Sequence, residues 1–261
     1  MSTAPNVYIV FYSLYGHIYT LAKQIQLGLE AQGVNVKLYQ VPETLSEEVL
    51  QKMGAPPKPD VPIITADELK EADAILWGIP TRFGSVPAQI KAFLDSTGGL
   101  WASGALAGKL TSAFVSSGSN HGGQESTVFN TLTYFAHHGL LYAPLGFADP
   151  HLFDVEEVVG GSAWSAGTIA SGDGSRQVSD KEKQVATTQA KNFAKLVLAM
   201  HKGKAILEKA NKVDEPQQTP VVQKQKEAAP AKEEQQPKPA TPPKETKSDK
   251  TDKGVSKCFC M

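Results

Sequence analysis

The chain has 261 residues, of which 41% are hydrophobic, and a net charge of −1, as expected for a globular protein of one or two domains. Residues 1–203 carry 14 Lys and Arg against 18 Asp and Glu, whereas residues 204–261 carry 12 against 9. The larger part shows no basic stripe, so nucleic-acid binding is not expected. Both cysteines, Cys258 and Cys260, lie in the smaller part, which excludes disulfide stapling and cysteine catalysis in the larger one.

The first two hundred residues alternate between strand and helix periodicity. Strands are expected at residues 7–12, 34–41, 74–79, 110–115 and 140–143. Helices are expected from residue 18 to Gly33, around Glu68, from Pro87 over Leu94, over residues 127–138, and from the capping box of Ser179 and Glu182 to about His201. This alternation predicts an α/β fold, a doubly wound five-stranded parallel sheet with helices on both faces. Residues 144–178 show little periodicity and are long for a passive connection.

The segment from residue 7 to residue 22 reads as a strand, a hydroxyl-rich loop and the start of a helix. A helix N-terminus favours a bound anion, because its first N–H groups have no partner within the helix. The loop lacks the glycine pattern of a dinucleotide site and the Gly-Lys pattern of a triphosphate site. Ser13, Tyr15 and Thr20 instead offer hydroxyl groups around Gly16. This set suits a single terminal phosphate such as that of FMN, although many strand–loop–helix units are only structural.

Two further loops support a nucleotide site. Residues 80–84 and 116–123 follow the third and fourth expected strands and, like residues 13–20, are rich in Ser, Thr and Gly. The carboxyl ends of parallel strands meet at one edge of the sheet, where doubly wound proteins bind ligands. The three loops are therefore expected to form one site.

Five motifs carry a resemblance to a known family. They are P-T-R-F-G (80–84), T-G-G-L-W-A-S-G (97–104), G-G-Q-E (122–125), A-H-H-G (136–139) and the run from G-G at 160 to S-R-Q at 177. In this order the chain resembles the WrbA-type NAD(P)H:quinone oxidoreductases, in particular fungal members with a lipidated C-terminal tail. The resemblance implies a flavodoxin-like fold with strand order 2-1-3-4-5, FMN as cofactor and NADH or NADPH as co-substrate. It also implies a homotetramer or dimer with flavin sites between subunits.

The resemblance places the FMN-binding residues in the three loops. The residues implied at the phosphate are Ser13, Leu14, Tyr15, Gly16, His17 and Ile18. Those implied along the ribityl chain and the ring are Thr81, Arg82 and Phe83. Those implied at the polar edge of the flavin are Ser116, Ser117, Gly118, Ser119, Asn120, His121 and Gly122, with Asn120 and His121 differing from the Gly and Thr that the family often has.

Three residues are implied around the reacting groups. Tyr15 is expected near the nicotinamide, Trp101 is expected to close the substrate pocket, and His137 is expected to face the flavin ring. His137 is the candidate proton donor to the reduced quinone, although a histidine at a helix C-terminus also has a structural role. Hydride transfer itself needs no protein nucleophile, and no metal site is expected. A flavodoxin-type electron carrier and a flavin-fold scaffold protein remain as alternative functions.

The smaller part of the chain has a different character. Residues 1–203 are interpreted as the FMN-binding domain, and residues 204–257, rich in Pro, Lys and Glu, as a disordered linker. Residues 258–261, Cys-Phe-Cys-Met, fit a prenylation motif with the lipid on Cys258. With no signal peptide and no run of 18 apolar residues, we expect a cytoplasmic quinone reductase that is held on the cytosolic face of a membrane, the plasma membrane, and protects against oxidative stress.

Overall fold

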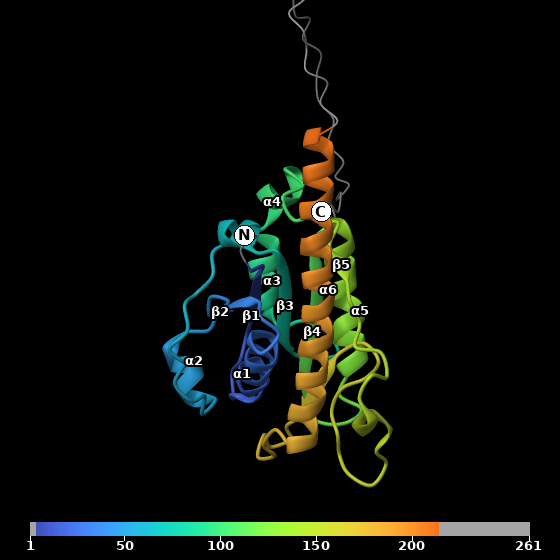
Figure 1. Cartoon of the computed structure of the whole chain (residues 1–261). Helices are drawn as coiled ribbons and strands as arrows, with labels where there is room; N and C mark the ends of the chain where they lie inside the picture. The colour runs from blue at the N-terminus through green and yellow to red at the C-terminus, as the bar shows by residue number, and fades with distance from the viewer. Residues whose placement is uncertain (1–3, 214–261) are drawn as a thin grey trace, which may run out of the picture. The chain divides into compact units, whose positions relative to one another are not determined.

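The computed structural model describes residues 4–213, and within them six strands form one parallel sheet. Figure 1 shows the sheet between two layers of helices. The strands are β1 (Asn6–Phe11), β2 (Asn35–Gln40), β3 (Ala74–Pro80), β4 (Leu110–Ser117), β5 (Leu141–Tyr142) and β6 (Ala166–Ile169). The order β2-β1-β3-β4-β5, with parallel pairing throughout, confirms the predicted topology. The expectations for residues 214–257 and for Cys258 lie outside the described residues.

The helices are α1 (His17–Glu30), α2 (Glu47–Lys52), α3 (Ala88–Asp95), α4 (Gly98–Ala102), α5 (Gln124–His137) and α6 (Asp180–Val213), with 3-10 turns η1 (Ala66–Glu71) and η2 (Pro150–Phe153). Helices α1 and α6 cover one face of the sheet, and α3 and α5 cover the other. Gly28 of α1 lies against α6, where an added Cβ would be 2.8 Å from the Cβ of Ala190. The missing side chain therefore permits the close approach of these two helices.

The three central strands are buried along almost their whole length, as parallel strands covered on both faces must be. Along β1, Val7, Ile9 and Phe11 pack toward α1 and α6, while Tyr8 and Val10 pack toward the other layer. This alternation follows from the two-residue period of a strand. The result is two separate cores that hold the carboxyl ends of the strands at one edge.

The fifth position of the sheet is shared by two short strands. Strand β5 pairs with Leu110 and Thr111 of β4, and β6 pairs with residues 114–117 further along the same strand. We expected only the strand at residues 140–143, so the five-strand prediction misses β6. Its four residues, Ala-Gly-Thr-Ile, are too few to show a strand period. Residues 143–165 form the excursion that separates β5 from β6.

Helix α6 is longer than predicted. The Ser179 hydroxyl accepts a hydrogen bond from the Glu182 N–H (3.2 Å) and the Ser179 N–H donates to the Glu182 carboxylate (2.8 Å), which confirms the capping box. The helix continues past the predicted end at about His201 to Val213, so residues 204–213 are helical and not disordered. Residues 204–210 are all Ala, Leu, Lys, Glu or Ile, and no proline occurs between Pro150 and Pro216. Within residues 4–213, no helix is both long and apolar enough to cross a bilayer.

Candidate active site

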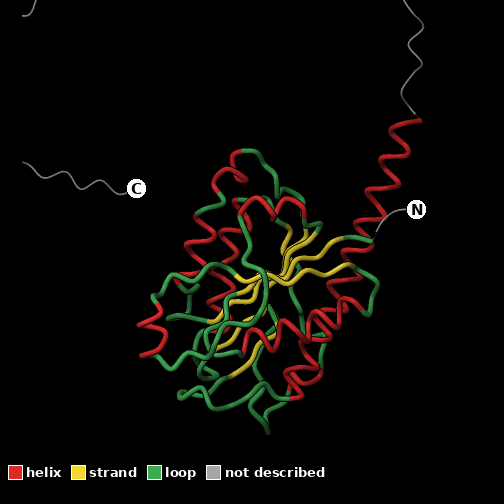
Figure 2. The backbone as a smooth tube through the Cα atoms, turned by 90° about the vertical axis from the view of Figure 1, so that its left-hand side faces the viewer, coloured by secondary structure: helices red, strands yellow, loops and turns green. Residues whose placement is uncertain are grey.

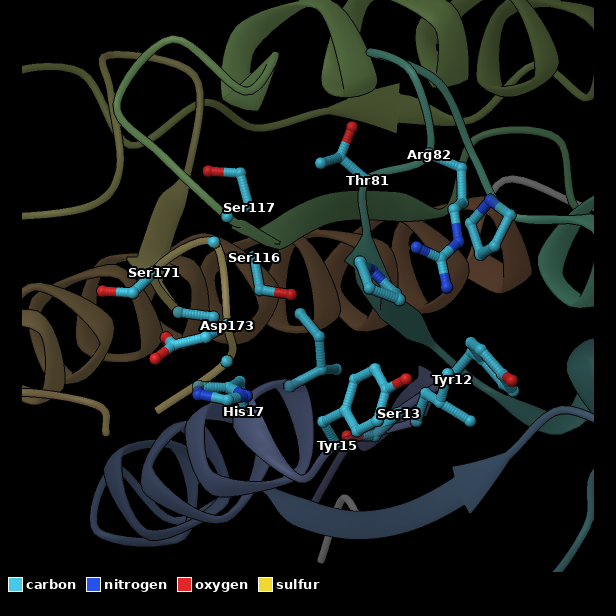
Figure 3. Close-up of a pocket in the computed structure, with 18 residues that line it drawn as sticks. Tyr12, Ser13, Tyr15, His17, Thr81, Arg82, Ser116, Ser117, Ser171 and Asp173 are labelled. Atoms are coloured by element: carbon cyan, nitrogen blue, oxygen red, sulfur yellow. The ribbon is translucent and has the colours of Figure 1, made fainter. Parts of the chain in front are cut away.

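A cavity of about 430 Å³ opens at the carboxyl-terminal edge of the sheet. Figure 3 shows side chains from the loops after β1, β3, β4 and β6 around it. This volume lies in the range of small-molecule sites. The predicted residues that line the cavity are Ser13, Leu14, Tyr15, His17, Ile18, Thr81, Arg82, Ser116, Ser117 and Gly118. The three loops that sequence patterns placed at one edge do therefore meet there.

The N-terminus of α1 forms the floor of the cavity. Gly16 has a φ of 90°, a left-handed conformation that glycine adopts without strain, and it is followed by the first helical residue, His17. The Ser13 hydroxyl accepts a hydrogen bond from the Tyr19 N–H at 3.3 Å and so caps the helix. The remaining N–H groups of the first turn are available to an anion in the cavity. This end of α1 can hold a phosphate group.

Two of the hydroxyl groups expected at the anion are engaged elsewhere. The Thr20 hydroxyl donates to the carbonyl oxygen of Gly16 at 3.1 Å, within its own helix. The Tyr15 hydroxyl donates to the carbonyl oxygen of Met53 at 3.3 Å, and its ring is half-exposed at the cavity rim. The backbone of α1 and Ser13 therefore replace the predicted ring of three hydroxyls, because a Thr in the first turn readily bonds back to the residue four before it.

Sequence analysis missed one wall of the cavity, the loop after β6. Its contributing residues are Ala170, Ser171, Gly172, Asp173 and Gly174. The Ala170 N–H donates to the Ser117 carbonyl oxygen at 2.8 Å, which holds this loop beside the end of β4. The wall is rich in Ser and Gly, like the other three loops, and this composition was the signal that could have identified it. It was missed because the strand before it was missed.

A buried ion pair holds this wall in place. Arg176 donates to both carboxylate oxygens of Glu182 (2.9 and 3.0 Å) and to the carbonyl oxygen of Ile169. Glu182 is fully buried and also accepts hydrogen bonds from the N–H groups of Gly160, Ile169 and Ser179 and from the Thr168 hydroxyl. One carboxylate thus joins the carboxyl end of β6 and the backbone at Gly160 to the start of α6.

The loop after β6 is also bonded to the N-terminus of α1, which forms the floor of the cavity. The Nε2 atom of His17 lies 2.8 Å from the carbonyl oxygen of Arg176, and since a carbonyl only accepts, Nε2 carries the proton. Asp173 accepts hydrogen bonds from the N–H and hydroxyl of Ser175. These bonds lower the pKa of Asp173. The first residue of α1 and the loop after β6 are therefore fixed relative to each other.

A second polar network supports the side of the cavity near Tyr12. The Tyr12 hydroxyl donates to Glu43 at 2.9 Å, and Lys58 forms an ion pair with the same carboxylate at 2.7 Å. Burial opposes ionisation of Glu43, but hydrogen bonds from Lys58, Leu45, Gln89 and Tyr12 together lower its pKa to about 2. Burial and the Glu43 carboxylate raise the pKa of Tyr12. Tyr12 is thus a neutral, fixed hydroxyl at the cavity surface.

The loop after β3 places Thr81 and Arg82 over the cavity. Thr127 at the start of α5 donates its hydroxyl to that of Thr81 at 2.7 Å, and Arg82 and Ser85 close a turn through two backbone hydrogen bonds. Figure 3 shows the Arg82 guanidinium on the side of the cavity near Tyr12. Its permanent charge suits an electron-rich ligand. Phe83, at the tip of this turn with a φ of 52°, is fully exposed and does not line the cavity.

The remaining predicted residues lie outside the cavity of their own chain. Ser119, Asn120, His121 and Gly122 form the turn between β4 and α5, and Gly16 contributes no side chain. His137 is the last residue of α5, which starts beside the cavity and runs away from it for about 20 Å. It lines a separate groove with Lys91 and Tyr134. Trp101 on α4 is exposed and follows α3, which also runs away from the cavity. The directions of α3 and α5, which a motif does not reveal, account for the positions of both residues.

The cavity fits FMN by the chemistry of its donors. The floor at α1 suits the phosphate, the hydroxyls of Ser116 and Thr81 suit a ribityl chain, and Arg82 suits the electron-rich end of the ring. Within residues 4–213, no cluster of His, Cys, Asp and Glu could hold a metal ion.

Fold and site together define a flavodoxin-like nucleotide-binding protein. A WrbA-like flavodoxin structure from Agrobacterium tumefaciens superposes with a TM-score of 0.54 at 21% identity, covering 75% of this chain and 99% of that one. Residues 13–152 match the family described as NADPH-dependent FMN reductase.

Named relatives show which family of flavin-binding proteins the chain belongs to. The chain is 54% identical over 193 residues to NAD(P)H quinone oxidoreductase PST2 of Candida albicans, covering 74% of this chain and 96% of the relative. It is also 54% identical to Quinone-oxidoreductase QR2 of Triphysaria versicolor, covering 73% and 94%. The chain belongs to the NAD(P)H quinone oxidoreductase family within the FMN reductases. The family expected from its five motifs is confirmed.

Proposed function

We propose that this enzyme reduces quinones by two electrons, with NADH or NADPH as donor and FMN held in the cavity. The observation that carries the proposal is the four-loop cavity above the N-terminus of α1. The chain is also 54% identical over 193 residues to named quinone oxidoreductases. When bound, FMN supplies the chemistry, because it accepts hydride from the nicotinamide and passes electrons to the quinone. The protein supplies binding, orientation and charge.

The described residues divide these tasks. Ser13 and the first turn of α1 hold the phosphate, and Thr81 and Ser116 orient the sugar-like chain. Arg82, which lines the cavity, would stabilise negative charge on a bound, reduced flavin. Tyr15, half-exposed at the rim of the cavity, would contact the nicotinamide.

The proposal includes assembly into a homotetramer or dimer. His137 and Trp101 lie away from the cavity of their own chain, and both are exposed. In an oligomer they can complete the site of a neighbouring subunit, His137 as proton donor to the quinone and Trp101 as the closing side chain. Phe83, fully exposed beside the cavity, gives such a neighbour an apolar contact.

The test is turnover of purified, FMN-loaded protein. We expect a flavin absorbance spectrum and oxidation of NADH or NADPH that depends on both FMN and benzoquinone. A two-electron product, hydroquinone without semiquinone radical, is expected by electron spin resonance. Bound FMN without any turnover would contradict the proposal and favour a scaffold protein, and one-electron products would favour an electron carrier.

We further propose a cytosolic location on a membrane, through a lipid on Cys258, and a protective role against oxidative stress. The sequence Cys-Phe-Cys-Met supports the lipid, since it fits the prenylation pattern. An oligomer would carry several lipid anchors, which together bind a membrane more tightly than one. Intact mass of protein from its own cell measures the modification. Cys258→Ser is expected to release the protein from plasma-membrane fractions that are washed with high salt, with unchanged flavin content, and unchanged membrane recovery after that wash would contradict this part. Loss of tolerance to added quinones on deletion tests the protective role.

A further inference from the structure

Helix α6 has an exposed side that its packing with the sheet does not use. Figures 1 and 2 show the helix continuing beyond the body of the fold. The residues that pack into the core, among them Val185, Phe193 and Val197, occupy one side of the helix and end at about residue 200. From residue 202 to residue 210 no residue is buried. The last part of α6 therefore presents most of its circumference to its surroundings.

The exposed side carries two adjoining stripes. At 3.6 residues per turn, four exposed lysines fall within an arc of about 40°. This lysine stripe consists of Lys191, Lys195, Lys202 and Lys209. Beside it, within about 100°, lies an apolar stripe in which Leu196, Ile206 and Leu207 are 48%, 66% and 64% exposed. Its other members are Ala199, Gly203 and Ala210.

The charged residues on this side of α6 are all positive. Between Glu182 and Ala210 the helix contains one acidic residue, Glu208, which lies more than about 90° around the helix from the lysine stripe. None of the ion pairs among residues 4–213 involves a lysine of the stripe. The positive charge is therefore not neutralised by the chain's own described residues.

We propose that this side of α6 is a docking surface for an anionic lipid bilayer. A helix with lysines beside an apolar stripe lies along the headgroup region, with its apolar side chains inserted and its ammonium groups on the phosphates. A second copy of the same surface would bring eight lysines together, so the charge favours lipid over self-association. The contact is separate from any lipid on Cys258 and from quinone reduction.

The test is binding of full-length, FMN-loaded Cys258→Ser protein to vesicles, which removes the contribution of a covalent lipid. Co-sedimentation is expected with phosphatidylcholine vesicles that contain about one third phosphatidylserine, and not with phosphatidylcholine alone. Binding should be lost at about 0.5 M salt, where charges are screened beyond a few ångströms. No binding to the anionic vesicles would overturn the proposal.

Two pairs of substitutions locate the surface. Lys202→Gln with Lys209→Gln keeps helix propensity and is expected to weaken binding about twenty-five-fold, since each lysine near an anionic surface contributes about fivefold. The control, Lys52→Gln with Lys70→Gln, removes the same charge from α2 and η1 and should leave binding unchanged. Equal losses in both would overturn the proposal.

The apolar stripe has its own test. Ile206→Ser with Leu207→Ser is expected to weaken vesicle binding while the sedimentation coefficient of the protein in solution stays the same. A changed sedimentation coefficient with unchanged vesicle binding would show that a second copy covers the stripe and would overturn the proposal. NADH oxidation by all variants in solution should match the parent, because none of the substituted residues lines the cavity.

Discussion

The carboxylate of Glu182 is the point at which the fold and the cavity are most directly joined. It is fully buried and accepts hydrogen bonds from Arg176, from three backbone N–H groups and from the Thr168 hydroxyl. Glu182→Gln keeps the size of the side chain but turns one acceptor oxygen into a donor that faces other donors. It also leaves the guanidinium of Arg176 without its counter-charge.

The expected loss of stability in Glu182→Gln follows from these contacts. Removing one partner of a buried ion pair costs about 3–5 kcal/mol, and because the Arg176 side chain is 24% exposed, we expect the lower end, about 3 kcal/mol. For a folded unit of this size that corresponds to a fall in melting temperature of roughly 6–12 °C. The wall formed by residues 170–174 depends on the same network, so FMN affinity should fall on the order of tenfold, which is about 1.4 kcal/mol.

Thermal unfolding followed by circular dichroism measures the first effect, and quenching of flavin fluorescence on titration of apoprotein measures the second. Glu208→Gln is the matched control, since it removes the same charge from an exposed position on the same helix. A melting temperature within about 2 °C of the parent, together with unchanged FMN affinity, would refute the idea that this carboxylate organises the cavity wall.

Three further outcomes are expected. Ser13→Ala removes the hydrogen-bond acceptor of the Tyr19 N–H and should lower the free energy of unfolding by about 1 kcal/mol and weaken FMN binding in the fluorescence titration. Thr20→Ala should leave FMN affinity unchanged, because the Thr20 hydroxyl bonds within α1. Equal effects of the two substitutions on FMN affinity would contradict the described floor of the cavity. Glu43 has a pKa of about 2 against an ordinary 4.5, so its stabilising effect is complete above pH 4.5 and is lost as the pH falls toward 2. Urea midpoints at pH 6, 4 and 3 should therefore fall more steeply for the parent than for Glu43→Gln, and parallel profiles would argue against the Tyr12–Glu43–Lys58 network. Gly78→Ala places a Cβ 2.6 Å from the Phe114 ring and should destabilise the core by about 2 kcal/mol in urea unfolding, while Gly98→Ala, with open space around it, should not.

Sequence periodicity was sufficient for the central layer of the fold. Residues 7–12, 74–79 and 110–115 are mostly apolar because both faces of their strands are covered, and this pattern can be recognised without knowledge of distant contacts. The same holds for the floor of the cavity, where strand, loop and helix are consecutive. The loop after β3 was found for the same reason.

The sequence could not show features that depend on contacts far along the chain. Strand β6 is defined by its pairing with β4 and by Glu182, not by a period of its own. The distance of His137 from the cavity follows from the direction of α5, and motif order contains no such information. The helix was predicted to end at about His201 because the composition changes after residue 203. It continues to Val213 because the residues that follow are still good helix formers.

The division of the fifth sheet position between β5 and β6 has a consequence for the order of folding. Phe114 pairs with Ala166, 52 residues further along the chain. The chain must therefore lose the conformational entropy of closing that loop before the wall at residues 170–174 can form. The floor at α1 needs only neighbouring residues and can form early. We expect the wall to be among the last parts to assemble and the first to open, as hydrogen exchange of apoprotein would measure. Bound flavin should then slow unfolding far more than it speeds refolding, because its contacts to the wall are absent from the folding transition state.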